Sequence, residues 1–359
     1  MNTKPVFHGS DIEKICEYYH LNQEDIVNFG ANVNPIGIST HVKQVLASHL
    51  DLLSSYPDRD YQSLRNTVSE YCGVPADYVL PGNGSSELIS LLIETRAPKR
   101  TLLLGPTYSE YSRELSLSNS KCNEFLLKET DEFILNVDFL CQSLLAGSYD
   151  FLIICNPNNP TGTVVDSEEL KEFIHKVPKD IIIVVDEAYI ELSSNPDVKS
   201  MVSEISDDTN VVVARTFSKL YGLAGVRLGY AMCNKEMHAI LQKCTSVFTG
   251  SRVALAGAMA ALDDEEYIKK TKAAMLEGRK YLTDEFTKMG FYVYPSETNF
   301  LYVNTGYNAA EFAEECKKYG LIIRGNFEYS RITVGRMDQN EKMVGIVKKI
   351  IESGELKKI

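Results

Sequence analysis

The chain of 359 residues has no apolar run near the roughly 18–20 residues that a membrane span requires. Its first residues, MNTKPVFHGSDIEKI, lack the apolar segment and the small-residue cleavage site of a secretory signal. Repeats and low-complexity tracts are also missing. These absences predict a cytoplasmic protein.

Metal-binding patterns are missing too. The eight cysteines stand singly, without a CxxC pair, and the six histidines form no HExxH motif. A cysteine in an apolar stretch, such as Cys155 in FLIIC, behaves as a small hydrophobe. The sequence therefore predicts no metal site and gives little support to a zinc hydrolase.

Positive charge is scarce. The chain has 37 Lys and Arg residues against 49 Asp and Glu residues, and its formal net charge is −12. A nucleic acid would meet a repulsive surface, and the sequence has no basic stripe interleaved with aromatic residues. We expect neither a nucleic-acid partner nor a membrane partner.

What the sequence does have is an alternation of apolar runs with amphipathic stretches. Continuous β-branched runs are typical of strands buried on both faces. Such runs occur at 101–105 (TLLLG), 151–155 (FLIIC), 181–186 (IIIVVD) and 211–216 (VVVART). With helical stretches between them, such as 166–177, they predict an α/β domain whose mostly parallel sheet is flanked by helices.

A different pattern follows. A long helical stretch at 254–290 precedes alternating segments that surround a helix at about 309–319. This order predicts a smaller C-terminal α+β domain on which the N-terminal segment packs. We place the large domain at 42–255 and the small domain at 1–41 and 256–359. The end of the chain, KKIIESGELKKI, is expected to be a terminal helix.

In an open α/β sheet, ligands bind beyond the carboxyl ends of the strands. The first candidate segment there is PGNGSSELISLL (81–92), a glycine turn that opens a helix. The N–H groups of such a helix suit a phosphate, and Ser85 and Ser86 add hydroxyl groups. An ordinary helix cap explains Ser85 about as well. The segment is neither a dinucleotide fingerprint, since Glu87 replaces the third glycine, nor a P-loop.

The second candidate segment is NPNNPTG (156–162), directly after FLIIC. Its two prolines restrict the backbone, so Asn159 between them could direct a rigid amide at a ligand. On composition alone, a surface loop explains the segment better.

The third and fourth segments supply charge. Asp186 ends an apolar strand, where a buried carboxylate needs a cationic partner; a simple turn cap is the competing explanation. Lys219 follows a buried strand and stands among Thr216, Ser218 and Arg227 in RTFSKLYGLAGVRLGY. A cationic neighbour and partial burial both favour the neutral amine that acts as a nucleophile.

Together, the four strand ends supply a phosphate cradle, an amide, an acid and a nucleophilic amine. Pyridoxal 5'-phosphate (PLP) presents a phosphate, a phenolic oxygen, a pyridine nitrogen and an aldehyde, so the two sets match. Each motif is weak alone, and their occurrence in this order makes the prediction strong.

On the NPNNPTG, DEAY and RTFSKLYGLAGVRLGY motifs, the chain resembles the class I/II aminotransferases of PLP fold type I. The similarity runs from ANVNPIG (31–37) to RITVG (331–335). Within that superfamily the chain is most similar to the branch of histidinol-phosphate aminotransferase and threonine-phosphate decarboxylase.

The resemblance implies a role for each cofactor-binding residue. Lys219 would carry PLP as a Schiff base and move a proton, and Asp186 would hold the pyridine nitrogen protonated. Asn159 and Tyr189 would bind the phenolic oxygen, and Tyr108 in GPTYSEY would stack on the ring. The phosphate would be bound by Ser85, Ser86, Thr216, Ser218 and Arg227.

The resemblance also implies residues outside this set. Tyr56 in SSYPDRDY would reach the phosphate of a neighbouring subunit, which requires a homodimer. Arg331 would bind a substrate carboxylate or phosphate with help from Arg324, and Asn32 in ANVNPIG would also bind substrate.

The motifs leave the substrate open. Ser86 departs from the GSDE of histidinol-phosphate aminotransferases, and FHGSDI and PTYSEY are more similar to the decarboxylase. FSKLYGLAGVRLGY and RITVG are more similar to the aminotransferase, whereas Arg252 in TSVFTGSRVAL fits neither pattern. We expect a transaminase for a phosphorylated amino compound, with glutamate and 2-oxoglutarate as the second pair.

Three alternatives remain beside this expectation. The first is a PLP decarboxylase of a phosphorylated amino acid, because both reactions start from the same residues. A non-catalytic PLP-sensing regulator would need an attached DNA-binding domain, for which this acidic chain has no spare segment. A nicotinamide-dependent dehydrogenase is disfavoured by the missing GxGxxG.

Overall fold

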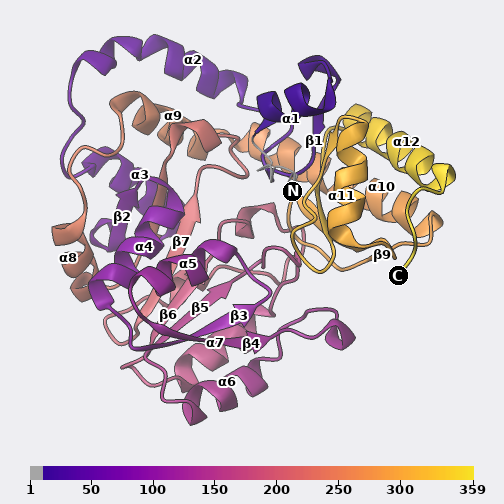
Figure 1. Cartoon of the computed structure of the whole chain (residues 1–359). Coiled ribbons are helices and arrows are strands. Elements are labelled where there is room, and N and C mark those ends of the chain that lie inside the picture. Colours follow the sequence, from indigo (N-terminus) through magenta and orange to yellow (C-terminus); the bar gives the residue numbers. More distant parts are fainter. Residues whose placement is uncertain (1–10) are drawn as a thin grey trace. The chain divides into compact units, whose positions relative to one another are not determined.

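The computed structural model describes residues 11–359 (Figure 1). The FHGS part of the FHGSDI motif lies outside the described residues. The chain divides into two compact units. The large unit comprises Ile36–Asn159 and Thr163–Lys272, and the small unit comprises the described residues up to Pro35 with Pro160–Gly162 and Ala273–Ile359. The domain limits expected from the sequence stay a prediction.

The large unit is built on a seven-stranded sheet in the order β2-β8-β7-β6-β5-β3-β4. Only β8 runs antiparallel to its neighbours, so the sheet is mostly parallel, and the predicted α/β fold class is confirmed. The strands are β2 Val79–Gly82, β3 Arg100–Gly105, β4 Lys121–Leu126, β5 Phe151–Cys155, β6 Ile182–Asp186, β7 Val211–Thr216 and β8 Gly229–Met232.

The strands that the sequence predicts are those buried on both faces. The four apolar runs form β3, β5, β6 and β7, within one residue of the expected limits. The edge strand β4 was not predicted, because its sequence KCNEFL is almost wholly exposed and has no apolar run. The sequence also gave no prediction of β2 and β8, which are short and contain Pro81, Gly82 and Gly229.

The helices of the large unit are α2 Thr40–Ser48, α3 Gln62–Cys72, α4 Gly84–Arg96, α5 Ser109–Leu117, α6 Val137–Ala146, α7 Ser167–Lys176, α8 Lys235–Cys244 and α9 Arg252–Asp263. The single long helical stretch expected at 254–290 is wrong in one respect. It is two helices, α9 and α10 Glu265–Lys288, separated at Asp264. Asp264 accepts a hydrogen bond from the N–H of Tyr267 at 3.1 Å, which begins the second helix.

One face of the sheet packs against α4, α5 and α8. The cluster includes Leu88 and Leu92 from α4, Tyr111 and Leu115 from α5, and Met237 and Leu241 from α8. Ile182 and Val184 of β6 belong to this cluster. Since side chains alternate along a strand, Asp186 continues their row on the same face. A carboxylate therefore ends an apolar row, against the helix that carries Tyr111.

The small unit contains short strands and three helices that lie wholly within it among the described residues. The strands are β1 Val27–Asn28, β9 Tyr292–Val293, β10 Phe300–Asn304, β11 Leu321–Ile322 and β12 Ser330–Thr333, and the helices are α1 Ile12–Tyr19, α11 Ala309–Lys318 and α12 Met337–Ser353. The antiparallel sheet has the order β12-β10-β9, and β1 pairs in parallel with β11. The smaller C-terminal domain with antiparallel strands is thus confirmed.

The end of the chain differs from the terminal helix expected there. Helix α12 ends at Ser353, and Gly354 adopts a left-handed conformation with φ +67°. The following segment is not helical, and Lys358 in it forms a bridge with Tyr307. Gly354 therefore ends the helix as a C-terminal glycine cap. Within residues 11–359, no helix is long and apolar enough to cross a membrane.

Candidate active site

The predicted cofactor residues of the large unit gather at one edge of the sheet. β2, β3, β5, β6 and β7 are parallel to one another, so their carboxyl ends lie on the same side. Each is followed by a predicted site segment. Neighbouring strand positions bring Cys155 opposite Asp186, and Asp186 opposite Ala214. The parallel sheet thus brings together segments that are far apart in the sequence.

Asp186 is the buried anion of this edge. It is 4% exposed, and its Oδ2 accepts a hydrogen bond from the Tyr111 hydroxyl at 2.5 Å. Its Oδ1 accepts one from the N–H of Ala188 at 3.0 Å. Burial raises the pKa of Asp186, while these two hydrogen bonds and the charge of Lys219 act in the opposite direction. Among the described residues it forms no ion pair, so a cationic ligand would be favoured here.

Lys219 lies in the loop after β7 and is partly buried. Its Nζ lies 5.2 Å from the ring centroid of Tyr189, which is itself buried. Tyr189 stands three residues after Asp186, which ends β6, so this distance places the amine close to the end of that strand. The structure therefore brings the predicted amine nucleophile to the predicted acid.

The predicted phosphate cradle depends on a missing side chain. Gly84 begins α4 with φ +80°, and a Cβ there would lie 2.8 Å from Nη2 of Arg227. The side chain of Asn83, at the N-cap, makes no capping hydrogen bond in the described structure. A guanidinium therefore lies beside the positive end of a helix dipole. Two positive groups this close suit an anion such as phosphate.

Hydroxyl groups complete this cradle. The Thr216 hydroxyl donates to Ser218 Oγ at 2.9 Å, and the N–H of Ser218 donates to Thr216 Oγ1 at 3.1 Å. Arg227 Nη1 donates to the Ala224 carbonyl at 3.0 Å and approaches Ser218 Oγ at 3.5 Å. These contacts hold the guanidinium and the hydroxyls in one group, and Ser85 is buried nearby in the first turn of α4.

Tyr108 and Ser86 form a second group at the same edge. Tyr108 precedes α5, and burial raises its pKa, while a hydrogen bond with Ser86 acts in the opposite direction. The rings of Tyr108 and Tyr111 pack edge to face, with centroids 5.4 Å apart. The predicted stacking residue is therefore fixed by α5.

Asn159 is buried in the NPNNPTG loop. The neighbouring asparagines hold this loop: Asn156 Oδ1 accepts from the N–H of Val165 at 3.0 Å, and Asn158 Nδ2 donates to the Pro106 carbonyl at 3.0 Å. The loop is thus a fixed structure and not the simple surface loop that composition favoured.

The predicted substrate residues lie together in the small unit. Arg331 and Arg324 pair through their backbones on neighbouring segments. Arg331 is buried, donates to the Gly30 carbonyl at 3.0 Å, and lies near the rings of Phe300 and Phe327. Asn32 accepts a hydrogen bond from the Thr333 hydroxyl at 2.9 Å. Two arginines and an amide thus occupy one corner of this unit.

Tyr56 lies in the segment between α2 and α3. It is 80% exposed, and its ring packs on Phe248 with centroids 5.0 Å apart. Arg252, which fits neither sequence pattern, donates to the Ser55 hydroxyl at 3.0 Å and so supports the Tyr56 segment.

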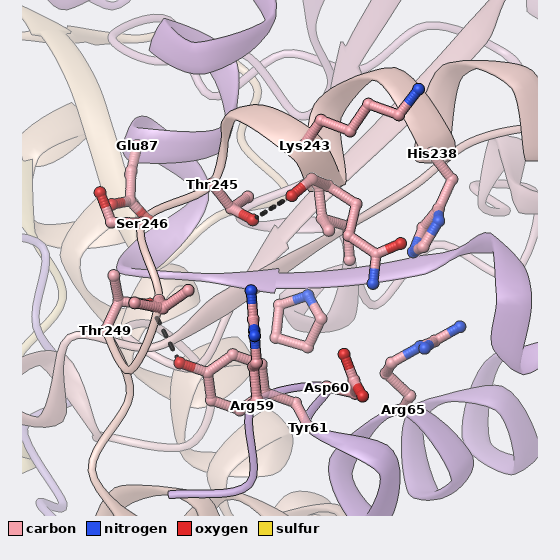
Figure 2. A pocket seen from close by; sticks show the side chains of 14 residues that line it. Arg59, Asp60, Tyr61, Arg65, Glu87, His238, Lys243, Thr245, Ser246 and Thr249 are labelled. Atoms are coloured by element: carbon pink, nitrogen blue, oxygen red, sulfur yellow. Dashed lines mark hydrogen bonds between the residues drawn. The ribbon is translucent and has the colours of Figure 1, made fainter. Parts of the chain in front are cut away.

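A cavity of about 450 Å³ lies in the same unit (Figure 2). Its walls carry charges of both signs, including Arg59 and Lys243 with Asp60 and Glu87. Tyr61 closes one side, where its hydroxyl accepts from the N–H of Gly250 at 3.1 Å. The described residues that line the cavity include none of the predicted cofactor residues, so it is not the candidate active site.

Sequence reasoning missed two features of the site. Tyr111 stands three positions after Tyr108 in GPTYSEY, a helical spacing that could have placed both rings on one face. Glu187 and Arg215 form a buried ion pair at 3.0 Å, and the predictions named neither residue. A signal was available, because Glu187 directly follows the apolar strand β6 and Arg215 stands inside β7, where a buried charge needs a partner.

Comparison with known proteins gives a consistent result. The family described as aminotransferase class I and II matches residues 24–347. The histidinol-phosphate aminotransferase of Brevibacillus brevis is 31% identical over 98% of this chain and 97% of its own.

Solved structures agree in fold. Histidinol-phosphate aminotransferase from Sinorhizobium meliloti, in complex with pyridoxal-5'-phosphate, superposes with a TM-score of 0.88, at 22% identity over 98% of both chains. L-threonine-O-3-phosphate decarboxylase from Porphyromonas gingivalis gives a TM-score of 0.77, at 24% identity over 91% of this chain and 100% of its own.

The family match and the fold together define a PLP enzyme of fold type I, and the clustered acid, amine and anion-binding residues fit that cofactor. The chain belongs to the class I and II aminotransferase family. It is a PLP-dependent transaminase, and the predicted enzyme class and cofactor are confirmed. The large unit fits this cofactor, because Gly84 leaves room for Arg227 at the helix end and the buried Asp186 lacks a protein ion pair among the described residues.

Proposed function

We propose that this transaminase moves the amino group of histidinol phosphate, or of a closely similar phosphorylated amine, to 2-oxoglutarate. The donor becomes a carbonyl compound and 2-oxoglutarate becomes glutamate. The observation that carries the proposal is 31% identity to a histidinol-phosphate aminotransferase over nearly the whole of both chains. The RITVG and FSKLYGLAGVRLGY motifs support the same assignment.

Each site residue has a proposed task. PLP, when bound, supplies the electron sink for the substrate's α-carbon. The amine of Lys219 takes the α-proton and returns it at another atom. Asp186 stabilises the protonated ring nitrogen, Tyr189 and Asn159 donate to the phenolic oxygen, and Tyr108 covers the ring. The remaining predicted residues, Ser85, Ser86, Thr216, Ser218 and Arg227, bind the phosphate.

Arg331 is proposed to bind the anionic end of the substrate, assisted by Arg324 and Asn32. A guanidinium offers paired N–H donors that match a phosphate or carboxylate. The burial of Arg331 beside two aromatic rings strengthens such a contact.

The protein is proposed to act as a homodimer in which Tyr56 binds the cofactor phosphate of the partner subunit. Exposed apolar side chains near Tyr56 support this proposal, since a patch of this kind is typical of protein interfaces. They are Leu50, Leu53, Val247 and Phe248. The expected cytoplasmic location stays a prediction.

Product analysis tests the reaction. With PLP, histidinol phosphate and 2-oxoglutarate, the protein should form glutamate, and Lys219→Ala should form none. Arg331→Ala should raise KM for the phosphorylated donor about tenfold or more, because that factor corresponds to the free energy of one hydrogen bond to a charged group. Release of carbon dioxide from threonine phosphate or serine phosphate, with no glutamate from any donor, would establish the decarboxylase alternative instead.

A further inference from the structure

Asp186 accepts a hydrogen bond from Tyr111, a residue to which no role has yet been assigned. Tyr111 projects from α5 into the apolar cluster on one face of the sheet, and its side chain is 2% exposed. Its hydroxyl donates to Asp186 Oδ2 at 2.5 Å, a short distance typical of a hydrogen bond to an ionised acceptor. The Ala188 N–H holds the other carboxylate oxygen. Two donors on two oxygens fix the plane of the carboxylate.

Tyr111 also packs against the ring of Tyr108. Its edge-to-face contact with Tyr108, at 84° between ring planes, fixes the side chain proposed to cover the cofactor ring. Tyr111 therefore touches both proposed ring contacts, the acid and the stacking tyrosine. One helical turn of α5 connects them, since the two tyrosines are three residues apart.

The hydrogen bond from Tyr111 matters because the carboxylate of Asp186 is buried. A carboxylate without water loses its solvation, and hydrogen bonds to the charged form are what restore it. Burial raises the pKa of Tyr111 well above its ordinary value, so the phenol keeps its proton and remains a donor. The titratable groups around Asp186 are Tyr111 on α5, Tyr108 just before α5, Cys155 on β5, Glu187, and Lys219 after β7.

We propose that Tyr111 is a positioning residue that keeps Asp186 ionised and oriented for the ring nitrogen of PLP. This inference rests on the proposed role of Asp186. Without the phenol, Asp186 takes up a proton at a higher pH and loses its charge toward the pyridinium. Tyr111→Phe removes the hydroxyl and keeps the ring contact with Tyr108, so it isolates this effect.

The test is the dissociation constant of PLP between pH 5 and pH 9, followed by absorbance. For Tyr111→Phe, binding should weaken with falling pH at a higher midpoint than in the unchanged protein, and Kd at the acid end should rise about tenfold or more. Tyr221→Phe is the matched control, because it also removes a buried phenol that donates to a carboxylate, Glu191, at 2.8 Å. It should leave the midpoint unchanged.

Further variants separate the possible failures. In an Asp186→Asn background, Tyr111→Phe should have no additional effect on the pH dependence. If Asp186→Asn alone binds PLP with the same pH profile as the unchanged protein, the proposed role of Asp186 fails. If only Tyr111→Phe matches the unchanged protein, the role of Tyr111 is refuted while that of Asp186 stands.

Should Tyr111→Phe fail to fold, 3-fluorotyrosine at position 111 replaces it. Fluorine makes the phenol a stronger donor with nearly the same shape, so the midpoint should move to lower pH. An unchanged midpoint in that protein would overturn the inference.

Discussion

Gly84→Ala tests the phosphate cradle, because it adds a single methyl group between helix α4 and Arg227. Two separate costs follow from the structure. An alanine at φ +80° costs about 1–2 kcal/mol in the left-handed region. The new Cβ would also lie 2.8 Å from Arg227 Nη2, closer than real Cβ contacts occur, so the guanidinium must move.

Gly73→Ala is the control for the first cost. Gly73 caps α3 at φ +71°, and nothing lies within 4 Å of the Cβ it would gain. Both variants should lose about 1–2 kcal/mol of unfolding free energy without PLP, as measured by urea denaturation. Only Gly84→Ala should also disturb the anion site.

The binding effect can be estimated. A hydrogen bond from a guanidinium to a phosphate contributes about 1.5–3 kcal/mol, which corresponds to roughly a tenfold to hundredfold rise in Kd for PLP. Added PLP should therefore raise the unfolding free energy of Gly73→Ala as it does for the unchanged protein, and raise that of Gly84→Ala much less. If Gly84→Ala bound PLP as tightly as Gly73→Ala, Arg227 and the start of α4 would not form the cradle.

Three further predictions follow from other parts of the chain. Lys219→Ala should form no covalent PLP adduct after borohydride treatment, whereas Lys243→Ala, which removes an exposed lysine, should form it as the unchanged chain does. Mass spectrometry measures the adduct, and an adduct in Lys219→Ala would refute the assignment. Mixing the inactive Lys219→Ala chain with an inactive Tyr56→Ala chain should restore a fraction of the activity in hybrid dimers, and full activity in a verified monomer would contradict a shared site. Burial lowers the pKa of His238, so below about pH 6.5 the unfolded chain binds its proton first and the native state loses stability. His238→Gln should show a smaller drop in urea midpoint between pH 7.5 and pH 5.5, and equal drops would exclude this cause.

The sequence alone determined much of the large unit. Strands buried on both faces carry continuous apolar runs, so β3, β5, β6 and β7 could be recognised without neighbours. Because parallel strands end at one edge, the polar segments after them could be assigned to one site. Asp186 stood out for this reason as a charge that ends an apolar strand, and Lys219 as a charge in the loop after one.

Other features depend on packing between segments that are distant in the sequence. The exposed strand β4 exists because β3 offers it a partner, and its own residues give no apolar signal. Arg227 and Gly84 are 143 positions apart, and only the folded sheet shows that the glycine's missing side chain makes room for the guanidinium. Tyr111 acquires its proposed role in the same way: its contact with Asp186, 75 residues away, exists only once α5 packs against β6 and excludes water from both groups.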